Sequence, residues 1–175
     1  NPQPGLLLAV AAAFLAACGP PPPFRAVTPP AGAFAWRTMR SEHVTLVTAR
    51  TRDGGTVTRR VHGVIAAERP DRLRLRALGP AGVTLFDLVA RDGRCALVRA
   101  PALRPDASSD AVLEALCRDL GATYRLGAPG HARIRYADWR PVGRSREPFR
   151  ILIEDAAAGF TADIAVVRTV LDEAL

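Results

Sequence analysis

The sequence contains no lysine, so all 24 of its basic residues are arginine. They outnumber the 17 acidic residues and leave a formal net charge of +7. Such a chain can bind nucleic acid, but the export segment described below predicts a compartment where phospholipid and lipopolysaccharide phosphates are the available anions. We therefore expect no nucleic-acid partner. Either these anions or solubility alone accounts for the charge.

The chain also has few of the residues that enzymes and metal sites use. Its three histidines, His43, His62 and His131, have no Cys, Asp or Glu at metal-ligand spacing. No Gly-x-Ser-x-Gly elbow, phosphate loop or zinc-protease helix occurs. Asp87 is the one carboxylate in a strongly apolar segment, and a hydrogen-bonded or rim position suits it better than catalysis. We expect no catalytic residue, metal or cofactor, and no enzyme activity.

No apolar run is long enough to cross a membrane. The longest, residues 6–17, has twelve residues, which is the length of a signal-peptide core and short of the ~20 that a spanning helix needs. Residues 15–18, LAAC, match the bacterial lipobox, so this segment resembles the signal peptide of lipoproteins. The resemblance implies cleavage before Cys18 and lipidation of its thiol, and Gly19 favours sorting to the outer membrane. The alternative is that Cys18 belongs to a buried helix.

Three segments follow from this reading. Residues 1–17 form the signal peptide, and residues 18–32 form the lipidated cysteine with a tether that is semi-rigid because it contains six prolines. Residues 33–175 are of the size of one domain.

Short runs of Val, Leu, Ile and Thr between turns indicate β-strands over residues 44–100. The turn 53–55, Asp-Gly-Gly, predicts a hairpin between the first two runs. Leucine or alanine alternates with arginine over residues 72–77, which predicts one apolar and one polar face. Residues 82–93 are apolar on both faces and predict a central strand, and residues 94–98 predict a fifth.

Residues 108–121 change to helical spacing, with a Ser-Ser-Asp start and a final glycine. Three more β runs follow, so we expect a mainly β protein of the α+β type, with eight or more antiparallel strands and a helix. Cys95 and Cys117 lie in a compartment that permits disulfides. They either pair or are two small buried hydrophobic residues.

Residues 71–98, DRLRLRALGPAGVTLFDLVARDGRCALV, resemble the LolA/LolB-like outer-membrane lipoprotein family, as LolB-like with unassigned cargo. The resemblance implies a curved antiparallel sheet, an incomplete β-barrel closed by helix, with acyl chains in an apolar cavity. It also implies a lipid-anchored protein of the outer membrane that faces the periplasm, with a LolA-like periplasmic carrier as a partner.

The cavity would be lined by the apolar residues that we expect to face inward. The alternative is that they pack a solid core. They are Val44, Leu46, Leu73, Leu75, Phe86, Leu88, Ile134, Tyr136, Ile151 and Ile153.

One turn departs from the family pattern. The family has an exposed leucine between proline and glycine in a membrane-facing loop, which helps to deliver cargo, whereas this chain has Pro80, Ala81 and Gly82. Alanine removes about 1.5 kcal/mol of apolar burial. We therefore expect a membrane-anchored lipoprotein that binds a lipid or acylated ligand but inserts less well into the membrane. The alternative is a structural or assembly lipoprotein that docks a partner through Arg72, Arg74 and Arg76.

Overall fold

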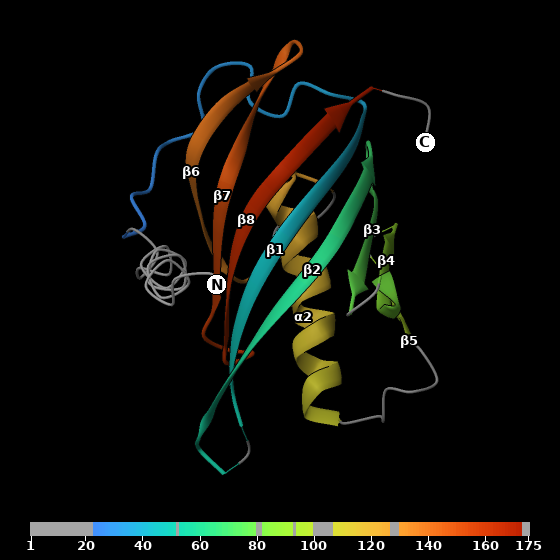
Figure 1. The fold of residues 1–175 in the computed structure, drawn as a ribbon, viewed down its shortest axis with the longest axis vertical. Helices are drawn as coiled ribbons and strands as arrows, with labels where there is room; N and C mark the ends of the chain where they lie inside the picture. The colour runs from blue at the N-terminus through green and yellow to red at the C-terminus, as the bar shows by residue number, and fades with distance from the viewer. Residues whose placement is uncertain are drawn as a thin grey trace, which may run out of the picture.

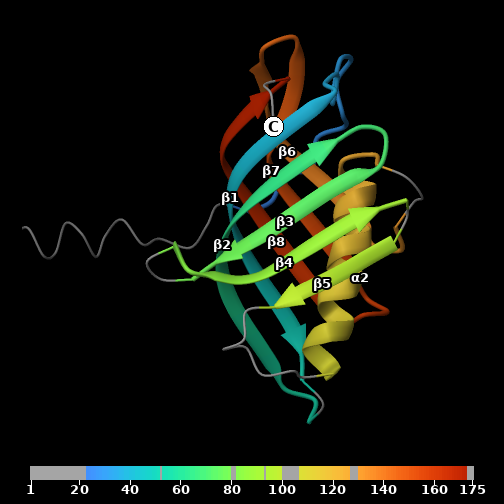
Figure 2. The same cartoon turned by 90° about the vertical axis from the view of Figure 1, so that its right-hand side faces the viewer.

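The fold is one antiparallel sheet of eight strands that curls around a helix (Figures 1 and 2). The computed structural model describes residues 23–51, 53–79, 82–92, 94–99, 107–126 and 130–172. The strands lie in the order β5-β4-β3-β2-β1-β8-β7-β6, so β5 and β6 are the edge strands and the barrel is incomplete. The elements are β1 (Thr38–Arg50), β2 (Thr56–Glu68), β3 (Arg72–Leu78), β4 (Thr84–Arg91), β5 (Arg94–Arg99), α2 (Ala107–Thr123), β6 (Arg133–Val142), β7 (Ser145–Asp155) and β8 (Phe160–Leu171).

The mainly β class and the incomplete barrel predicted from the sequence are thus confirmed. The hairpin is also confirmed: β1 pairs with β2 around Gly54, whose φ of +83° suits glycine. The segment predicted as a central strand is β4, and that prediction was wrong about its place, because β4 lies second from an edge. Its outward residues are half-buried because long arginine side chains on β3 lie beside them.

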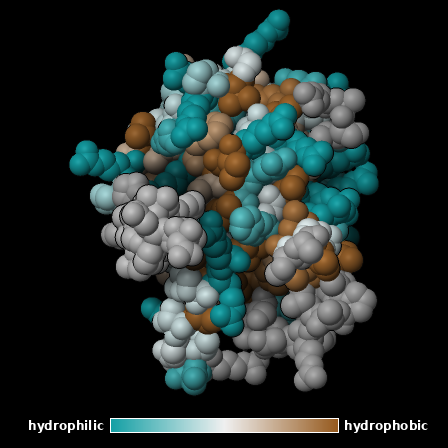
Figure 3. Space-filling view, viewed as in Figure 1, coloured by the Kyte–Doolittle hydropathy of each residue, from teal (hydrophilic) through white to brown (hydrophobic). Residues whose placement is uncertain are grey.

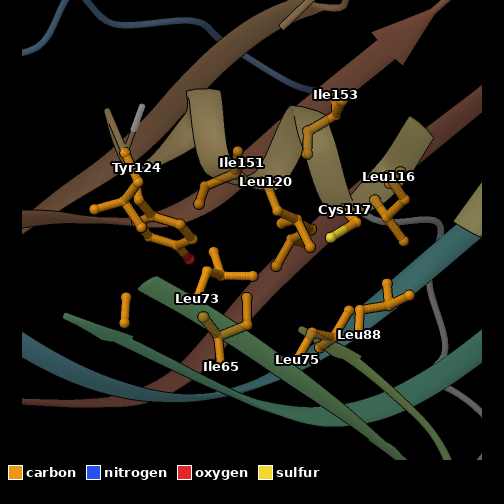
Figure 4. Packing of buried hydrophobic residues seen from close by; sticks show 14 of the residues in the cluster. Ile65, Leu73, Leu75, Leu88, Leu116, Cys117, Leu120, Tyr124, Ile151 and Ile153 are labelled. Carbon is orange, nitrogen blue, oxygen red and sulfur yellow. The ribbon is translucent and has the colours of Figure 1, made fainter. Parts of the chain in front are cut away.

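The core lies between the concave face of the sheet and α2. On β3, Leu73, Leu75 and Ala77 are buried while the alternating arginines are exposed, as the pattern predicted. Figure 4 shows leucines of β3 and β4 and isoleucines of β2 and β7 around Leu116 and Leu120 of α2. Burial of these apolar side chains is the main force that holds the helix against the sheet.

The helix begins one residue before its predicted range and extends two residues beyond it. It ends at Thr123, and the Leu126 N–H donates to the Gly121 carbonyl at 2.8 Å, which satisfies one of the last helical acceptors. A disulfide between Cys95 and Cys117 joins the edge strand β5 to α2, with 6.2 Å between the Cα atoms. Of the two alternatives that the sequence left open for these cysteines, the structure has the disulfide.

The proline-rich segment packs along the edge strand β6 (Figure 1). The Val27 N–H donates to the Tyr136 carbonyl at 2.7 Å, and the Trp139 indole donates to the Val27 carbonyl at 3.3 Å. The Phe24 ring lies under the guanidinium groups of Arg135 and Arg150. Residues 24–32, which we expected to act as a tether, thus cover a strand edge that would otherwise offer unpaired backbone groups.

Candidate ligand-binding face

The concave side of the sheet, which we call the inner face, is the candidate site. It carries most of the predicted cavity residues. Leu73, Leu75, Leu88, Ile151 and Ile153 are buried in the core cluster, and Phe86, Ile134 and Tyr136 pack against it. The strand order brings these residues, which are far apart in the chain, onto one curved apolar wall.

The placement of Val44 and Leu46 on this wall was wrong. Both lie on the opposite, outer face of the sheet, where Leu46 is 42% exposed and is paired with Arg60. Their neighbours on β1 with the other parity, from Met39 to Ala49, face inward. Hydrophobicity alone selects the wrong face because the inward residues in the middle of β1 are polar.

The hairpin register holds the signal that identifies the correct face. Asp53-Gly54-Gly55 sets Ser41 opposite Ile65, and the next ladder sets Ile65 opposite Leu75. Leu75 belongs to the clearly apolar face of β3. Cross-strand partners share a face, so Ser41 must face inward.

The inner face therefore contains a short polar row on β1: Ser41, His43 and Thr45, all buried. Burial lowers the pKa of His43 to about 4, although the nearby Ser41 backbone carbonyl opposes this change. The imidazole is consequently neutral near pH 7. A neutral, polar strip thus crosses an otherwise apolar wall.

Aromatic side chains close one end of the inner face. Phe34 makes edge-on contacts with Tyr124, Tyr136 and Trp139, with ring centroids 5.5–6.2 Å apart. The Tyr136 hydroxyl donates to the Thr123 carbonyl at 2.7 Å, and burial raises the pKa of Tyr136 to about 12. These groups stay neutral and fix the end of α2 against the sheet.

Arg69 and Glu147 hold this aromatic end together. The Arg69 guanidinium donates to the carbonyls of Trp36 at 3.0 Å and Phe34 at 3.1 Å, and it stacks on the Trp36 ring at 4.6 Å. Glu147 is buried, and burial raises its pKa even though the Ser145 hydroxyl donates to it. The role of this cluster is therefore to anchor the segment before β1.

A second polar cluster, in which two buried carboxylates meet the exposed Arg118, joins α2 to the end of β7. Arg118 donates to Asp155 at 3.0 Å and lies 3.5 Å from Asp119. Burial raises the pKa of Asp119. Burial also opposes ionisation of Asp155, but the Ala158 N–H and other hydrogen bonds hold its pKa below its usual value. Asp155 is thus the ionised partner of Arg118.

The outer face is hydrophilic with scattered apolar side chains (Figure 3). Its predicted docking arginines are paired: Arg74 and Arg76 donate to Asp87 at 2.8 and 3.2 Å, and Arg72 pairs with Glu68 at 3.2 Å. Burial opposes ionisation of Asp87, but both guanidinium groups hold its pKa below the usual value. Asp87 thus has the hydrogen-bonded position expected from the sequence.

Several predicted site residues lie outside the described residues. These are Cys18, the expected lipidation site, and Pro80 and Ala81 of the expected membrane-facing loop. Gly82 is exposed with a φ of +75°, and Val83 beside it is 61% exposed. Val83 therefore presents apolar surface next to the β3–β4 turn.

Among the residues that the structure describes, no three His, Cys, Asp or Glu side chains form a group able to hold a metal ion. His62 and His131 are exposed, while His43 is buried on the inner face. Within the same part of the chain, no helix is long and apolar enough to cross a membrane.

Comparison with solved structures defines the class of fold. The chain is similar to the crystal structure of LolA superfamily protein NE2245 from Nitrosomonas europaea, with a TM-score of 0.52. The match covers 82% of this chain and 90% of that chain at 9% sequence identity. No family model and no curated protein matches the sequence. The chain thus shares its fold, an incomplete barrel that curls around a helix, with that protein.

Proposed function

We propose that this protein binds an acyl chain of a lipid or acylated ligand on its inner face, and that it acts in lipid or lipoprotein trafficking to the outer membrane. The observation that carries the proposal is the curved apolar wall of a LolA-superfamily fold. Acyl binding needs contiguous apolar surface shielded from water, and this wall supplies it from all eight strands together with α2. No covalent chemistry is needed, so we propose no enzyme activity.

We also propose that Cys18 is lipidated and anchors the domain in the outer membrane, facing the periplasm, where a LolA-like carrier would be its partner. The packing of the N-terminal segment along β6 supports a particular orientation of the domain relative to the membrane. Pro23, the first described residue, is five positions after Cys18, so the two Cα atoms lie at most about 18 Å apart. The β6 edge would therefore lie close to the bilayer. Turn residues Pro80, Ala81 and Gly82 would contact the membrane only weakly.

The alternative, partner docking through the arginines of β3, has less support. Each of these guanidinium groups already has a carboxylate partner, so docking would have to replace an existing ion pair. On the inner face a ligand would compete with apolar side chains of α2, such as Leu116 and Leu120, rather than with an ion pair.

Native mass spectrometry of the mature domain, with Cys18→Ser to avoid the anchor, tests acyl binding directly. We expect a discrete bound lipid, lost in detergent and restored by adding a fatty acid. A protein that purifies without lipid and takes up no fatty acid would overturn the proposal. Replacing Arg72, Arg74 and Arg76 by alanine should leave this uptake unchanged, whereas the docking alternative predicts loss of partner binding.

A further inference from the structure

Two polar atoms on the inner face have no hydrogen-bond partner of good geometry among the described residues. They are the Ser41 Oγ and the His43 Nδ1, on side chains that are 1% and 4% exposed. The Ser41 backbone carbonyl lies near the imidazole but forms no hydrogen bond of good geometry with Nδ1. A buried donor without a partner has lost its hydration and gained nothing in return, so such atoms are uncommon in folded proteins. Their presence on the candidate binding wall points to a ligand that supplies the missing hydrogen-bond partners.

The two groups project from the same side of β1. They are two residues apart, which places them about 7 Å from each other along the strand. The register sets Ser41 opposite Ile65, which is followed across the sheet by Leu75 and Leu88. Each of these three apolar side chains is buried. The donors thus stand at the side of an apolar row that is packed against α2 in this structure, and an acyl chain would lie on this row in place of part of that packing.

Gly63 makes room for the imidazole. It lies opposite His43 on β2, and a Cβ at this position would be 2.9 Å from the His43 Nε2 and 2.9 Å from the Arg76 carbonyl oxygen. The ring of His43 therefore lies over the Gly63 backbone. Ala77, the next residue in the same row, is also small. Small residues beside a buried polar ring keep that part of the wall from being filled by apolar side chains.

The chemistry of the two groups selects a neutral acceptor. A serine hydroxyl donates one hydrogen bond, and a neutral imidazole with its proton on Nδ1 donates another. The cross-strand neighbours of His43 are Gly63 and Val166, which offer no charge to balance a carboxylate. An anionic group brought here would be desolvated without a counter-charge, which is costly.

We propose that the Ser41 hydroxyl and the His43 Nδ1–H bind the neutral carbonyl of an ester- or amide-linked acyl chain whose methylenes lie along Ile65, Leu75 and Leu88. This inference rests on the proposed acyl-binding function and adds the chemical class of the linkage. Two sources carry that linkage: a glycerolipid ester and an acylated protein amide.

The test compares ligands that differ only in the carbonyl. The Cys18→Ser mature domain is titrated with short-chain diacyl phosphatidylglycerol and with its dialkyl ether analogue. It is also titrated with an N-acyl peptide and with an analogue in which an uncharged alkyl ether replaces the amide. We expect the wild-type inner face to prefer the carbonyl form of at least one pair by about tenfold or more, from two hydrogen bonds. The pair that shows the preference identifies the source.

The variant pair Ser41→Ala and His43→Phe should abolish this preference, so that the carbonyl form and its ether analogue bind with equal affinity. The matched controls, Thr48→Ala and His62→Phe on the outer face, should keep it. If His43→Phe does not fold, Ser41→Ala alone should reduce the preference about fivefold. Equal wild-type affinity for both forms, or a preference that survives in the variants, would overturn the inference but leave acyl binding standing. Failure of every ligand to bind would overturn both.

Discussion

Cys95 on the edge strand β5 is joined by a disulfide to Cys117 in the middle of α2. The bond holds the helix to the margin of the sheet that it covers. Because β5 is an edge strand, it is hydrogen-bonded to only one neighbouring strand, β4, and the disulfide adds a covalent attachment to the helix. The covalent link thus helps to keep the inner face covered.

Removing this bond should lower stability without changing the fold. The disulfide spans 22 residues, and closing a loop of that length in the unfolded chain stabilises a protein by about 3 kcal/mol. In a Cys18→Ser background, adding Cys95→Ser and Cys117→Ser should lower the urea-derived free energy of unfolding by that amount. Reductant should have the same effect on the parent and none on the double variant. A parent that is insensitive to reductant would contradict the prediction.

Acid should destabilise the fold through His43. The pKa of His43 is about 4 in the folded protein and 6.5 for an unperturbed histidine, as in the unfolded chain. As the pH falls, the unfolded chain therefore binds a proton at His43 before the folded protein does. Stability should decline between pH 6.5 and 4, by about 3 kcal/mol for this group. Carboxylates titrate in the same range, so the measurement is the difference between wild type and His43→Gln. The variant should lose this part of the slope, while His62→Gln on the outer face should retain it.

Loss of the Arg69 guanidinium should release the segment before β1. In Arg69→Met the carbonyls of Phe34 and Trp36 lose their donor, and we expect the free energy of unfolding to fall by about 3 kcal/mol. Arg72→Met is the matched control, because its exposed ion pair with Glu68 contributes about 0.5 kcal/mol. Equal losses in the two variants would show that Arg69 does not anchor this segment.

The packed N-terminal segment can be tested by trypsin, which cleaves after Arg25. Phe24→Ala removes the contacts with Arg135 and Arg150, and cleavage at Arg25 should accelerate about tenfold. Phe149→Ala is the matched control, since that ring contacts Arg140 on the same hairpin. Peptide mapping separates cleavage at Arg25 from other sites. An unchanged rate in Phe24→Ala would mean that this ring does not hold the segment to β6.

Much of the fold was predictable from local patterns. The alternation of leucine and arginine in β3, the Asp-Gly-Gly turn and the helical spacing before Gly121 each act over a few residues. Each has one dominant physical cause: an apolar face, a positive φ or a helical period. These elements therefore lie where the sequence placed them, to within two residues at the end of α2.

The inner face was predictable only in part. Five of its ten proposed residues are in the buried core cluster and three pack against it, but Val44 and Leu46 lie outside because β1 carries its polar residues inward. Ser41 and His43 were not singled out as site residues. When a strand has apolar residues on both faces, its sequence does not show which face is buried. Pairing with the neighbouring strands decides this, because it fixes the register.

The sequence by itself determined the strands, the main hairpin, the helix and the outward arginines, because short-range periodicity and turn chemistry require no distant partner. Only the tertiary structure decided which face of β1 points inward, that Cys95 meets Cys117, and that the proline-rich segment lies on β6. These features depend on strand order and on the curl of the sheet. Both result from burying apolar surface over the whole domain, which no local pattern records.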